Sequence, residues 1–309
     1  MNSLPQNPKP TRLLITSALA ATALALSACG ANTDPLDDDA DTEASDDAIV
    51  IGSQAYYSNE IIAEIYAQAL EEEGFEVQRE FQIGQREVYL PELEDGKLDL
   101  LPDYSGNLVQ YYQDDAETGS PEEVHQQAQD AVPDGLMVLD WAEATDQDSY
   151  TVTAETAERY DLETIADLSA VGDSVTMAAN SEFDARPYGP EGALEVYGVT
   201  VEVVGVEDSG GPLTVGALVD GDVEVADIYT SSPAIAEENL VVLDDPEHLI
   251  LPQNVVPVAS EELDDDAVSV INDIQADLST DALVELNTQS VNDQASSADV
   301  AAQWLADRD

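Results

Sequence analysis

The sequence has very few cationic side chains, 8 Lys and Arg against 67 Asp and Glu, for a formal net charge of −59. A surface of this sign repels phosphate backbones, which argues against nucleic acid as a partner. Carboxylates rarely enter a protein core, so most of them coat the surface, where they hold water and repel one another. We therefore predict adaptation to high salt, because the Debye length shortens to ~3 Å at 1 M. A merely acidic surface proteome, or an acid-secreting cell, is the alternative.

Cysteine and histidine are almost absent. The single cysteine, Cys29, rules out an intrachain disulfide. With only His125 and His248, the sequence assembles neither a Ser-His-Asp triad nor a zinc site. We expect His125 on the surface of a helix. A secreted hydrolase with paired carboxylates is one hypothesis, but acidic residues are too abundant for any pair to be informative. We expect no enzyme activity, no cofactor and no metal.

The N-terminus predicts export. An apolar run over residues 13–26 follows Lys9 and Arg12 and is too short for a comfortable membrane span. It ends in Leu-Ser-Ala-Cys at Cys29, which resembles the lipobox of bacterial lipoproteins. We predict a signal peptide over 1–28 and lipidation of Cys29, against the alternative of a plain secretory peptide with an incidental cysteine. Residues 29–47 are acidic and nearly free of apolar side chains, which predicts a disordered tether. A calcium loop is less favoured, because the run lacks the glycine and spacing of an EF-hand.

A short pattern occurs twice. The segment Pro-Asp-Tyr-Ser-Gly around Tyr104 has a counterpart, Asp-Ile-Tyr-Thr-Ser, around Tyr229, at an offset of 125 residues, which is 229 − 104. In both copies a Leu-x-Asp-Gly sequence precedes the segment. This pattern predicts a helix that ends at an Asp-Gly turn, a short buried strand and a tyrosine just past the strand. Ligands of open α/β sheets bind at that end of the strands, so two similar lobes would point tyrosines at a shared cleft. Coincidence is the alternative, because such turns are common.

The rest of the chain alternates strands and helices, and its length suits two α/β domains. In the first half we expect strands over 49–52, 76–81 and 98–101 and a helix over 86–95. We also expect a helix capped by Ser58 that stops at Gly74, and a helix capped by Ser120 with Pro at its first position. In the second half we expect strands over 174–178 and 199–204 and a helix over 190–197. Helices over 264–278, 280–286 and 297–304 form the tail.

A series of segments, in order, resembles the substrate-binding proteins of ABC importers for quaternary-ammonium osmoprotectants such as glycine betaine, carnitine and choline. The similarity spans residues 49–305. The segments are Ile49-Val-Ile-Gly-Ser-Gln, Gly96-Lys-Leu-Asp-Leu-Leu-Pro-Asp-Tyr-Ser-Gly, Asp148-Ser-Tyr-Thr-Val, Asp161-Leu-Glu-Thr-Ile-Ala-Asp-Leu, Glu182-Phe-Asp-Ala-Arg-Pro-Tyr-Gly, Leu251-Pro-Gln-Asn-Val-Val-Pro-Val and Leu286-Asn.

The resemblance implies an α/β fold, the two-lobed periplasmic-binding-protein clamp with two hinge crossovers. Lobe 1 would comprise 48–147 and 251–309, lobe 2 would comprise 148–250, and the first crossover would lie near 147–152. The function implied is extracytoplasmic capture of the ligand and its delivery to an ABC permease and its ATPase. A stand-alone sensor or surface lipoprotein, or a different small solute, is the alternative.

The resemblance also implies a binding site. A quaternary ammonium cannot donate hydrogen bonds, so its recognition relies on aromatic faces. The cage tyrosines would be Tyr104, Tyr150 and Tyr229, with Asp148 nearby and Arg186 placed for a ligand carboxylate. Three positions depart from the family pattern, since Gln54, Asn107 and Gln253 stand where some members have Lys, a hydroxyl residue and a further cage tyrosine. The candidates to replace that ring are Tyr56, Tyr57, Phe183 and Tyr188.

Overall fold

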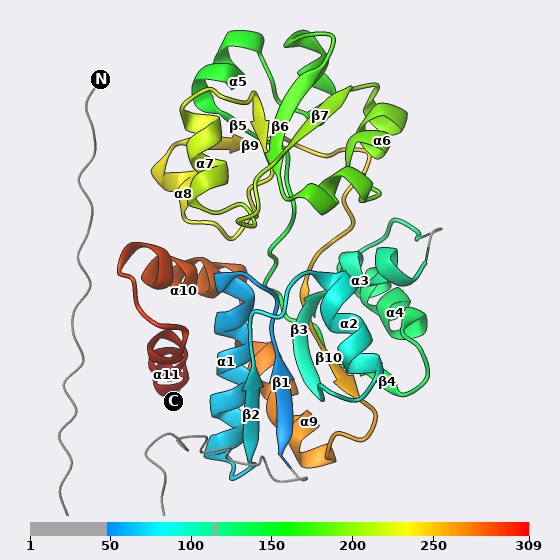
Figure 1. Ribbon diagram of the computed structural model, residues 1–309, viewed down its shortest axis with the longest axis vertical. Coiled ribbons are helices and arrows are strands. Elements are labelled where there is room, and N and C mark those ends of the chain that lie inside the picture. The colour runs from blue at the N-terminus through cyan, green and yellow to red at the C-terminus, as the bar shows by residue number, and fades with distance from the viewer. Residues whose placement is uncertain (1–47, 114–115, 309) are drawn as a thin grey trace, which may run out of the picture. The chain divides into compact units, whose positions relative to one another are not determined.

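Two β-sheets organise the part of the chain that this computed structural model describes, residues 48–113 and 116–308. The predicted signal peptide, the predicted lipidation site at Cys29 and the predicted acidic tether lie outside the described residues. Each sheet, with the helices packed on it, forms one lobe (Figure 1). The α/β fold with two lobes, predicted from the sequence, is confirmed.

The first sheet has the strand order β2-β1-β3-β10-β4. Its strands are β1 (Ile49–Gly52), β2 (Val77–Glu80), β3 (Leu100–Tyr104), β4 (Leu136–Val138) and β10 (Val255–Ser260). Strand β1 pairs in parallel with β2 and β3, whereas β10 runs antiparallel between β3 and β4. The strands alternate between two cores, since Leu100 and Val255 pack into one and Leu101 and Val256 into the other.

Helices cover both faces of this sheet. Helices α1 (Tyr57–Glu72), α9 (Asp265–Asp277), α10 (Thr280–Asn292) and α11 (Ser297–Asp307) lie on one face, and α2 (Arg86–Glu94), α3 (Ser105–Tyr112) and α4 (Pro121–Ala131) lie on the other (Figure 1). The cap predicted at Ser120 is present at the start of α4 and forms part of a capping box, because the Ser120 hydroxyl accepts from the Glu123 amide and the Glu123 carboxylate accepts from the Ser120 amide.

The second sheet repeats this arrangement in the order β7-β6-β8-β5-β9. Its strands are β5 (Thr151–Thr153), β6 (Val175–Ala179), β7 (Val201–Gly205), β8 (Val225–Ala226) and β9 (Leu240–Val242). Strand β6 pairs in parallel with β7 and β8, and β5 runs antiparallel between β8 and β9. Around it lie α5 (Ala154–Tyr160), η1 (Ile165–Ala170), η2 (Ser181–Ala185), α6 (Pro190–Gly192), the π-helical turn η3 (Ala193–Tyr197), α7 (Pro212–Val219) and α8 (Ala234–Glu237).

The chain passes between the sheets twice, between β4 and β5 and between β9 and β10. The two crossovers contact each other through an isolated antiparallel bridge between Thr145 and Asn254. In each sheet the antiparallel strand, β5 or β10, is the one that directly follows a crossover. The exact lobe boundaries, at residues 148 and 250, stay predictions.

The two copies of the tyrosine pattern occupy equivalent places. Strands β3 and β8 are the third strand of their sheets, and each follows a helix and a glycine turn. Gly96 has φ of 68° and Gly221 has φ of 75°, the left-handed conformation that favours glycine. The helix, turn, strand and tyrosine predicted from the sequence are therefore present in both lobes.

Two local predictions were wrong. Ser58 does not cap the first helix, because α1 begins at Tyr57 after an extended Tyr56, and the Ser58 hydroxyl instead accepts from Asn287 Nδ2 at 3.2 Å. His125 is not a surface residue, since it is 9% exposed and its Nε2 lies 2.8 Å from the Leu139 carbonyl oxygen. Both side chains form buried hydrogen bonds with partners that the local sequence does not reveal.

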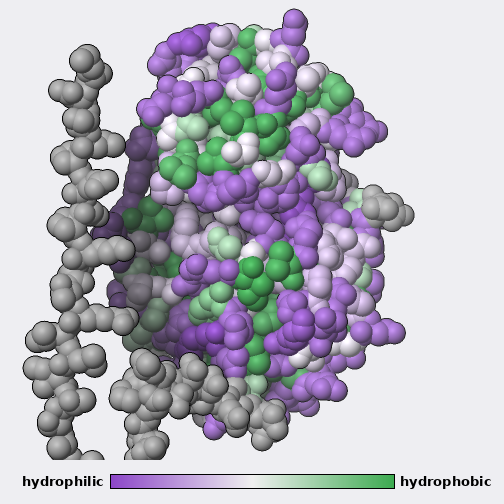
Figure 2. Space-filling model, viewed as in Figure 1, coloured by the Kyte–Doolittle hydropathy of each residue, from purple (hydrophilic) through white to green (hydrophobic). Residues whose placement is uncertain are grey.

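The surface carries the excess acid. Hydrophilic residues dominate the face in view, and hydrophobic residues appear on it only in separate patches (Figure 2). The six Lys and Arg side chains among the described residues all form ion pairs with carboxylates. They are Arg79, Arg86, Lys97, Arg159, Arg186 and Arg308. No cation in this part of the chain is left to neutralise the remaining acidic surface.

Candidate ligand-binding site

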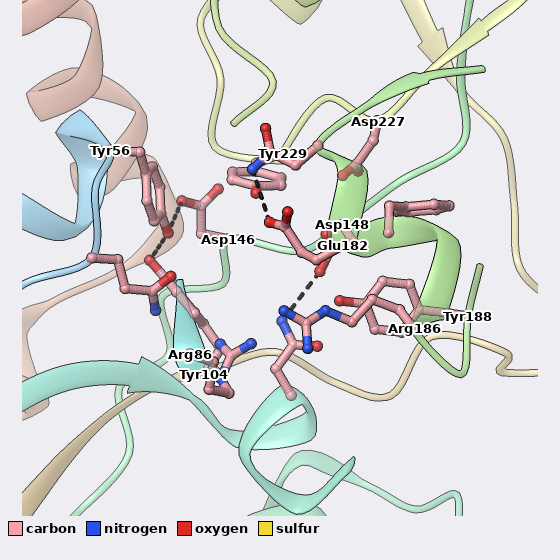
Figure 3. Close-up of a pocket in the computed structure, with 14 residues that line it drawn as sticks. Tyr56, Arg86, Tyr104, Asp146, Asp148, Glu182, Arg186, Tyr188, Asp227 and Tyr229 are labelled. Atoms are coloured by element: carbon pink, nitrogen blue, oxygen red, sulfur yellow. Dashed lines mark hydrogen bonds between the residues drawn. The ribbon is translucent and has the colours of Figure 1, made fainter. Parts of the chain in front are cut away.

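A cavity lies between the lobes, at the ends of the two equivalent strands. Both lobes and the first crossover contribute to its wall, and Figure 3 shows Tyr56 on one side of the space and Tyr188 and Arg186 on the other. The lining residues are Gln54, Tyr56, Arg86, Tyr104, Asn107, Asp146, Asp148, Asn180, Glu182, Phe183, Arg186, Tyr188, Asp227 and Tyr229. Most of these side chains are aromatic or carboxylic.

The order of the chain explains how these side chains meet. Gln54 and Tyr56 follow β1, Tyr104 ends β3, and Tyr229 follows β8, so each stands at the carboxyl end of a strand. Side chains at that end of a parallel sheet project into the crevice beyond it. Because residues of both lobes line one cavity, the two crevices face each other. The segment that contains η2 supplies Phe183 from the second lobe.

Aromatic rings from both lobes touch. The rings of Tyr56 and Tyr229 meet edge to face, with centroids 5.3 Å apart, and those of Tyr56 and Tyr104 are 6.5 Å apart. The hydroxyls of Tyr56 and Tyr104 hydrogen-bond to each other. On the opposite wall, Phe183 and Tyr188 are 5.6 Å apart at 72°. Burial raises the pKa of Tyr104 and Tyr229 well above its ordinary value, so both phenols stay neutral.

Six of the eight predicted ligand-binding residues line the cavity: Tyr104, Tyr229, Asp148, Arg186, Asn107 and Gln54. Tyr150 does not. It is 1% exposed, its hydroxyl donates to the Tyr188 carbonyl at 2.8 Å, and its ring stacks edge-on against Phe183 at 6.0 Å. Tyr150 thus lies behind the wall and supports it. Of the candidate replacement rings, Tyr56, Phe183 and Tyr188 reach the cavity, whereas Tyr57 lines a separate groove.

Gln253 also lies behind the wall. Its side chain is fully buried, its Nε2 donates to Asn107 Oδ1 at 2.9 Å, and its Oε1 accepts from the Asp148 amide at 3.0 Å. Asn107 Nδ2 in turn donates to Asp148 Oδ2 at 3.2 Å. Gln253 therefore fixes two lining residues without lining the cavity itself. Because Gln253 lies on the second crossover, this hydrogen-bond network includes a residue of the segment that joins the lobes.

Both arginines in the wall are paired with carboxylates outside it. Arg86 donates to Asp103 through Nε at 3.2 Å and Nη2 at 2.6 Å, and both side chains are buried. Burial lowers the pKa of Arg86, but the Asp103 carboxylate together with Tyr89 and Tyr188 outweighs that effect, so the net direction is upward. Arg186 of the second lobe pairs with Glu87 of the first at 2.7 Å, which joins the two lobes at the cavity rim.

The carboxyl groups in the wall form no ion pair with a lysine or arginine of the described residues. Asp148 and Asp227 share a hydrogen bond, and burial, followed by the nearby Asp148 carboxyl, raises the pKa of Asp227. The Glu182 carboxylate accepts from Asn180 Nδ2 at 3.0 Å. The wall therefore combines four carboxyl groups, Asp146, Asp148, Glu182 and Asp227, with ring faces.

Asp146 belongs to a buried cluster that bridges the lobes. Its Oδ1 accepts from the Ser231 amide at 3.2 Å and hydroxyl at 2.6 Å, and its Oδ2 accepts from the Tyr56 hydroxyl at 3.3 Å. Asn287 Nδ2 donates to the Ser231 hydroxyl at 2.7 Å. Burial raises the pKa of Asp146 to about 6, against the opposing effect of these hydrogen bonds.

Sequence reasoning missed several lining residues: Arg86, Asp146, Asn180, Glu182 as a wall acid, and Asp227. Two signals were available. Asp227 opens the second copy of the repeated segment, and Arg86 is as rare a cation as Arg186 in so acidic a chain. Asp146 gives no local signal, because acidic residues are too frequent for any one of them to stand out.

The described residues hold no group of His, Cys, Asp and Glu arranged to bind a metal ion. Within the same residues, no helix combines the length and the apolar character that crossing a membrane requires.

Two lobes, two crossovers and an interlobe cavity define a solute-binding protein of the clamp type. Residues 47–307 match the family described as the substrate-binding domain of ABC-type glycine betaine transport systems, and the chain belongs to this family. Its members are substrate-binding proteins of ABC importers and not enzymes, and they work outside the cytoplasm.

Individual relatives are distant. The chain is 24% identical over 272 residues to the glycine betaine-binding protein YehZ of Escherichia coli K12, covering 83% of this chain and 89% of that protein. A solved glycine betaine/carnitine/choline ABC transporter structure matches with a TM-score of 0.69 at 22% identity, covering 84% of this chain and 98% of the other. Lactococcal OpuAC, closed on glycine betaine, matches with a TM-score of 0.62 at 14% identity, covering 85% and 96%. At these identities the structures support the fold alone.

Proposed function

We propose that the protein captures a quaternary-ammonium osmoprotectant, glycine betaine, carnitine or choline, between its lobes and delivers it to an ABC permease and its ATPase. The observation that carries this proposal is the cavity wall, in which rings from both lobes stand beside carboxyl groups. A quaternary ammonium offers no hydrogen-bond donor, so ring faces and negative charge are the groups that attract it. The family, which serves glycine betaine transport, and the relative YehZ, a glycine betaine-binding protein, support the ligand class.

Capture would use closure of the two lobes on the ligand. Tyr104 and Tyr229 stand on different lobes, so a ligand held by both rings stabilises the closed arrangement. The Arg186–Glu87 pair and the Asp146 cluster already connect the lobes. In the same proposal, a lipid on Cys29 anchors the protein outside the cell membrane, residues 29–47 form its tether, and the acidic surface suits high salt.

The test is calorimetric titration of the purified protein, in molar salt, with glycine betaine, carnitine and choline. We expect Tyr104→Ala and Tyr229→Ala each to weaken binding by up to ~2 kcal/mol, roughly 30-fold, because each removes one desolvated cation–π contact. Tyr229→Phe keeps the ring and should bind as the wild type does. Tyr111→Ala is a matched control, because its ring lies in α3 and does not line the cavity.

Binding of at least one of the three solutes, weakened in both alanine variants and retained in both controls, supports the proposal. A folded protein that binds none of them has another ligand. Equal losses in Tyr111→Ala and Tyr229→Ala would mean that the tyrosines act on stability and not on the ligand.

A further inference from the structure

The charges around the cavity are unbalanced. Its wall holds four carboxyl groups against two guanidinium groups. Both guanidiniums already face carboxylates outside the wall, Arg86 on Asp103 and Arg186 on Glu87. Among the described residues, no lysine or arginine is therefore left uncompensated for the negative end of a ligand. A zwitterion would bring its carboxylate into a space that already holds an excess of acid.

Gln54 adds a second, independent observation. It lines the cavity, it is 5% exposed, and its Nε2 has no hydrogen-bond partner among the described residues. Its backbone amide is satisfied by Asn59 Oδ1 at 2.8 Å, whereas the side-chain donor is without a partner among the described residues. A buried amide donor without an acceptor is costly, which points to an oxygen atom on the ligand. This donor is neutral and adds no positive charge.

We propose that the cavity selects a quaternary-ammonium alcohol, of which choline is the simplest case, over a zwitterion that carries a carboxylate. This inference rests on the proposed function and narrows its ligand class. An alcohol oxygen can accept from Gln54 Nε2 while its proton is donated to a wall carboxylate such as Asp148 or Asp227. A ligand carboxylate can only accept hydrogen bonds, so it can accept from Gln54 Nε2 but is repelled by Asp148 and Asp227.

The decisive measurement is the ratio of dissociation constants for choline and glycine betaine, taken in low salt and in 1 M salt. We expect choline to bind at least about tenfold tighter, a factor that corresponds to 1.4 kcal/mol. The ratio should persist in molar salt, because charges in a buried wall are screened far less than charges on the surface. Carnitine, which has both a hydroxyl and a carboxylate, should bind more weakly than choline.

Variants separate the effect of the wall charges from the effect of the Gln54 amide. Glu87→Gln frees the charge of Arg186 and should narrow the ratio in favour of betaine, whereas the exposed Glu122→Gln should leave it unchanged. Gln54→Lys adds a cation at the unpaired donor and should narrow the ratio of dissociation constants further. Gln126→Lys adds the same charge at an exposed position and is the control, which should leave the ratio unchanged. Gln54→Leu should weaken choline but not tetramethylammonium, which has no oxygen for the amide to meet.

Betaine binding as tightly as choline, or a preference that disappears in 1 M salt, overturns the inference while the proposed function stands. Gln54→Leu weakening tetramethylammonium as much as choline would overturn the role given to the amide. Absence of binding by all four compounds is the failure of the proposed function itself. Circular dichroism of each variant shows whether a lost signal reflects unfolding, and an unfolded Gln54→Leu or Glu87→Gln variant is replaced by Gln54→Met or Glu87→Ala, which remove the same groups.

Discussion

The two copies of the strand-end tyrosine have the same backbone setting and opposite electrostatics. In the first lobe, Asp103 precedes Tyr104 and is neutralised by Arg86, with the Tyr89 hydroxyl also donating to it at 2.9 Å. In the second lobe, Asp227 lies two residues before Tyr229 and meets another acid, Asp148. The difference shows that the repeat places the rings, whereas the residues around each copy decide the charge. Any preference for a cation therefore arises mainly from the second lobe.

The largest effect that would test this contrast comes from Asp103→Asn. The variant leaves the buried Arg86 without its carboxylate, and loss of one partner of a buried pair costs ~3–5 kcal/mol of unfolding free energy. Asp227→Asn removes a carboxyl that has no cation among the described residues, so we expect no such loss. Urea unfolding in molar salt measures both. Glu155→Gln, which removes the exposed partner of Arg159, should cost less than ~1 kcal/mol. Equal losses in Asp103→Asn and Asp227→Asn would contradict the comparison.

A second, smaller effect concerns Asp146, which joins the two copies through Tyr56 and Ser231. Burial raises its pKa from 3.8 to about 6, so the folded state holds the proton more tightly than the unfolded state. The stability that this provides is present below about pH 4 and is lost as pH rises through about 6, which amounts to ~3 kcal/mol.

Unfolding free energies of wild type and Asp146→Asn, measured between about pH 4 and pH 7 in molar salt, should therefore diverge. The wild type should fall relative to the variant as pH rises. Asp134→Asn, at an exposed position, should run parallel to the wild type and corrects for the general repulsion of the acidic surface. Parallel curves for Asp146→Asn as well would show that Asp146 is ordinarily ionised in the fold.

The smallest effect tests whether the glycine turns of the two copies have the same backbone conformation. Gly96→Ala and Gly221→Ala each place a side chain in the left-handed region, which costs ~1–2 kcal/mol. Similar losses of unfolding free energy in the two variants, measured by thermal or urea unfolding, would support the equivalence of the two turns. A loss in one variant alone would contradict it. Gly216→Ala, inside α7 with open space around the glycine, should instead stabilise by ~0.5–1 kcal/mol.

Sequence patterns predicted the local structure well because they report local physics. Asp-Gly turns, apolar periodicity and the cap at Ser120 act over a few residues, and the elements they predicted are present. Tyr104 and Tyr229 could be placed at the cavity because Tyr104 ends β3 and Tyr229 lies just beyond the carboxyl end of β8. Ser58 and His125 were misplaced because their partners, Asn287 and the Leu139 carbonyl, lie elsewhere in the chain or depend on packing.

It was harder to predict which side chains line the cavity and which lie behind its wall. Tyr150 and Tyr229 look alike in sequence, yet only the packing of Tyr150 against Phe183 and Tyr188 shows that it lies behind the wall. Gln253 likewise replaces a ring by a hydrogen-bonded support for Asn107 and Asp148. Distinguishing a lining side chain from a supporting one requires the positions of both lobes, which no single segment contains.

The pairing of every described lysine and arginine with a carboxylate has a physiological consequence. We expect the counter-charge for the remaining acid to come from dissolved cations, which would link the stability of the fold to the salinity of its surroundings. If the proposed function holds, the protein would then be most stable at high external salinity, when an osmoprotectant is needed. Dilution would remove the screening when uptake is no longer required. The medium would then regulate the protein directly, without a separate sensor.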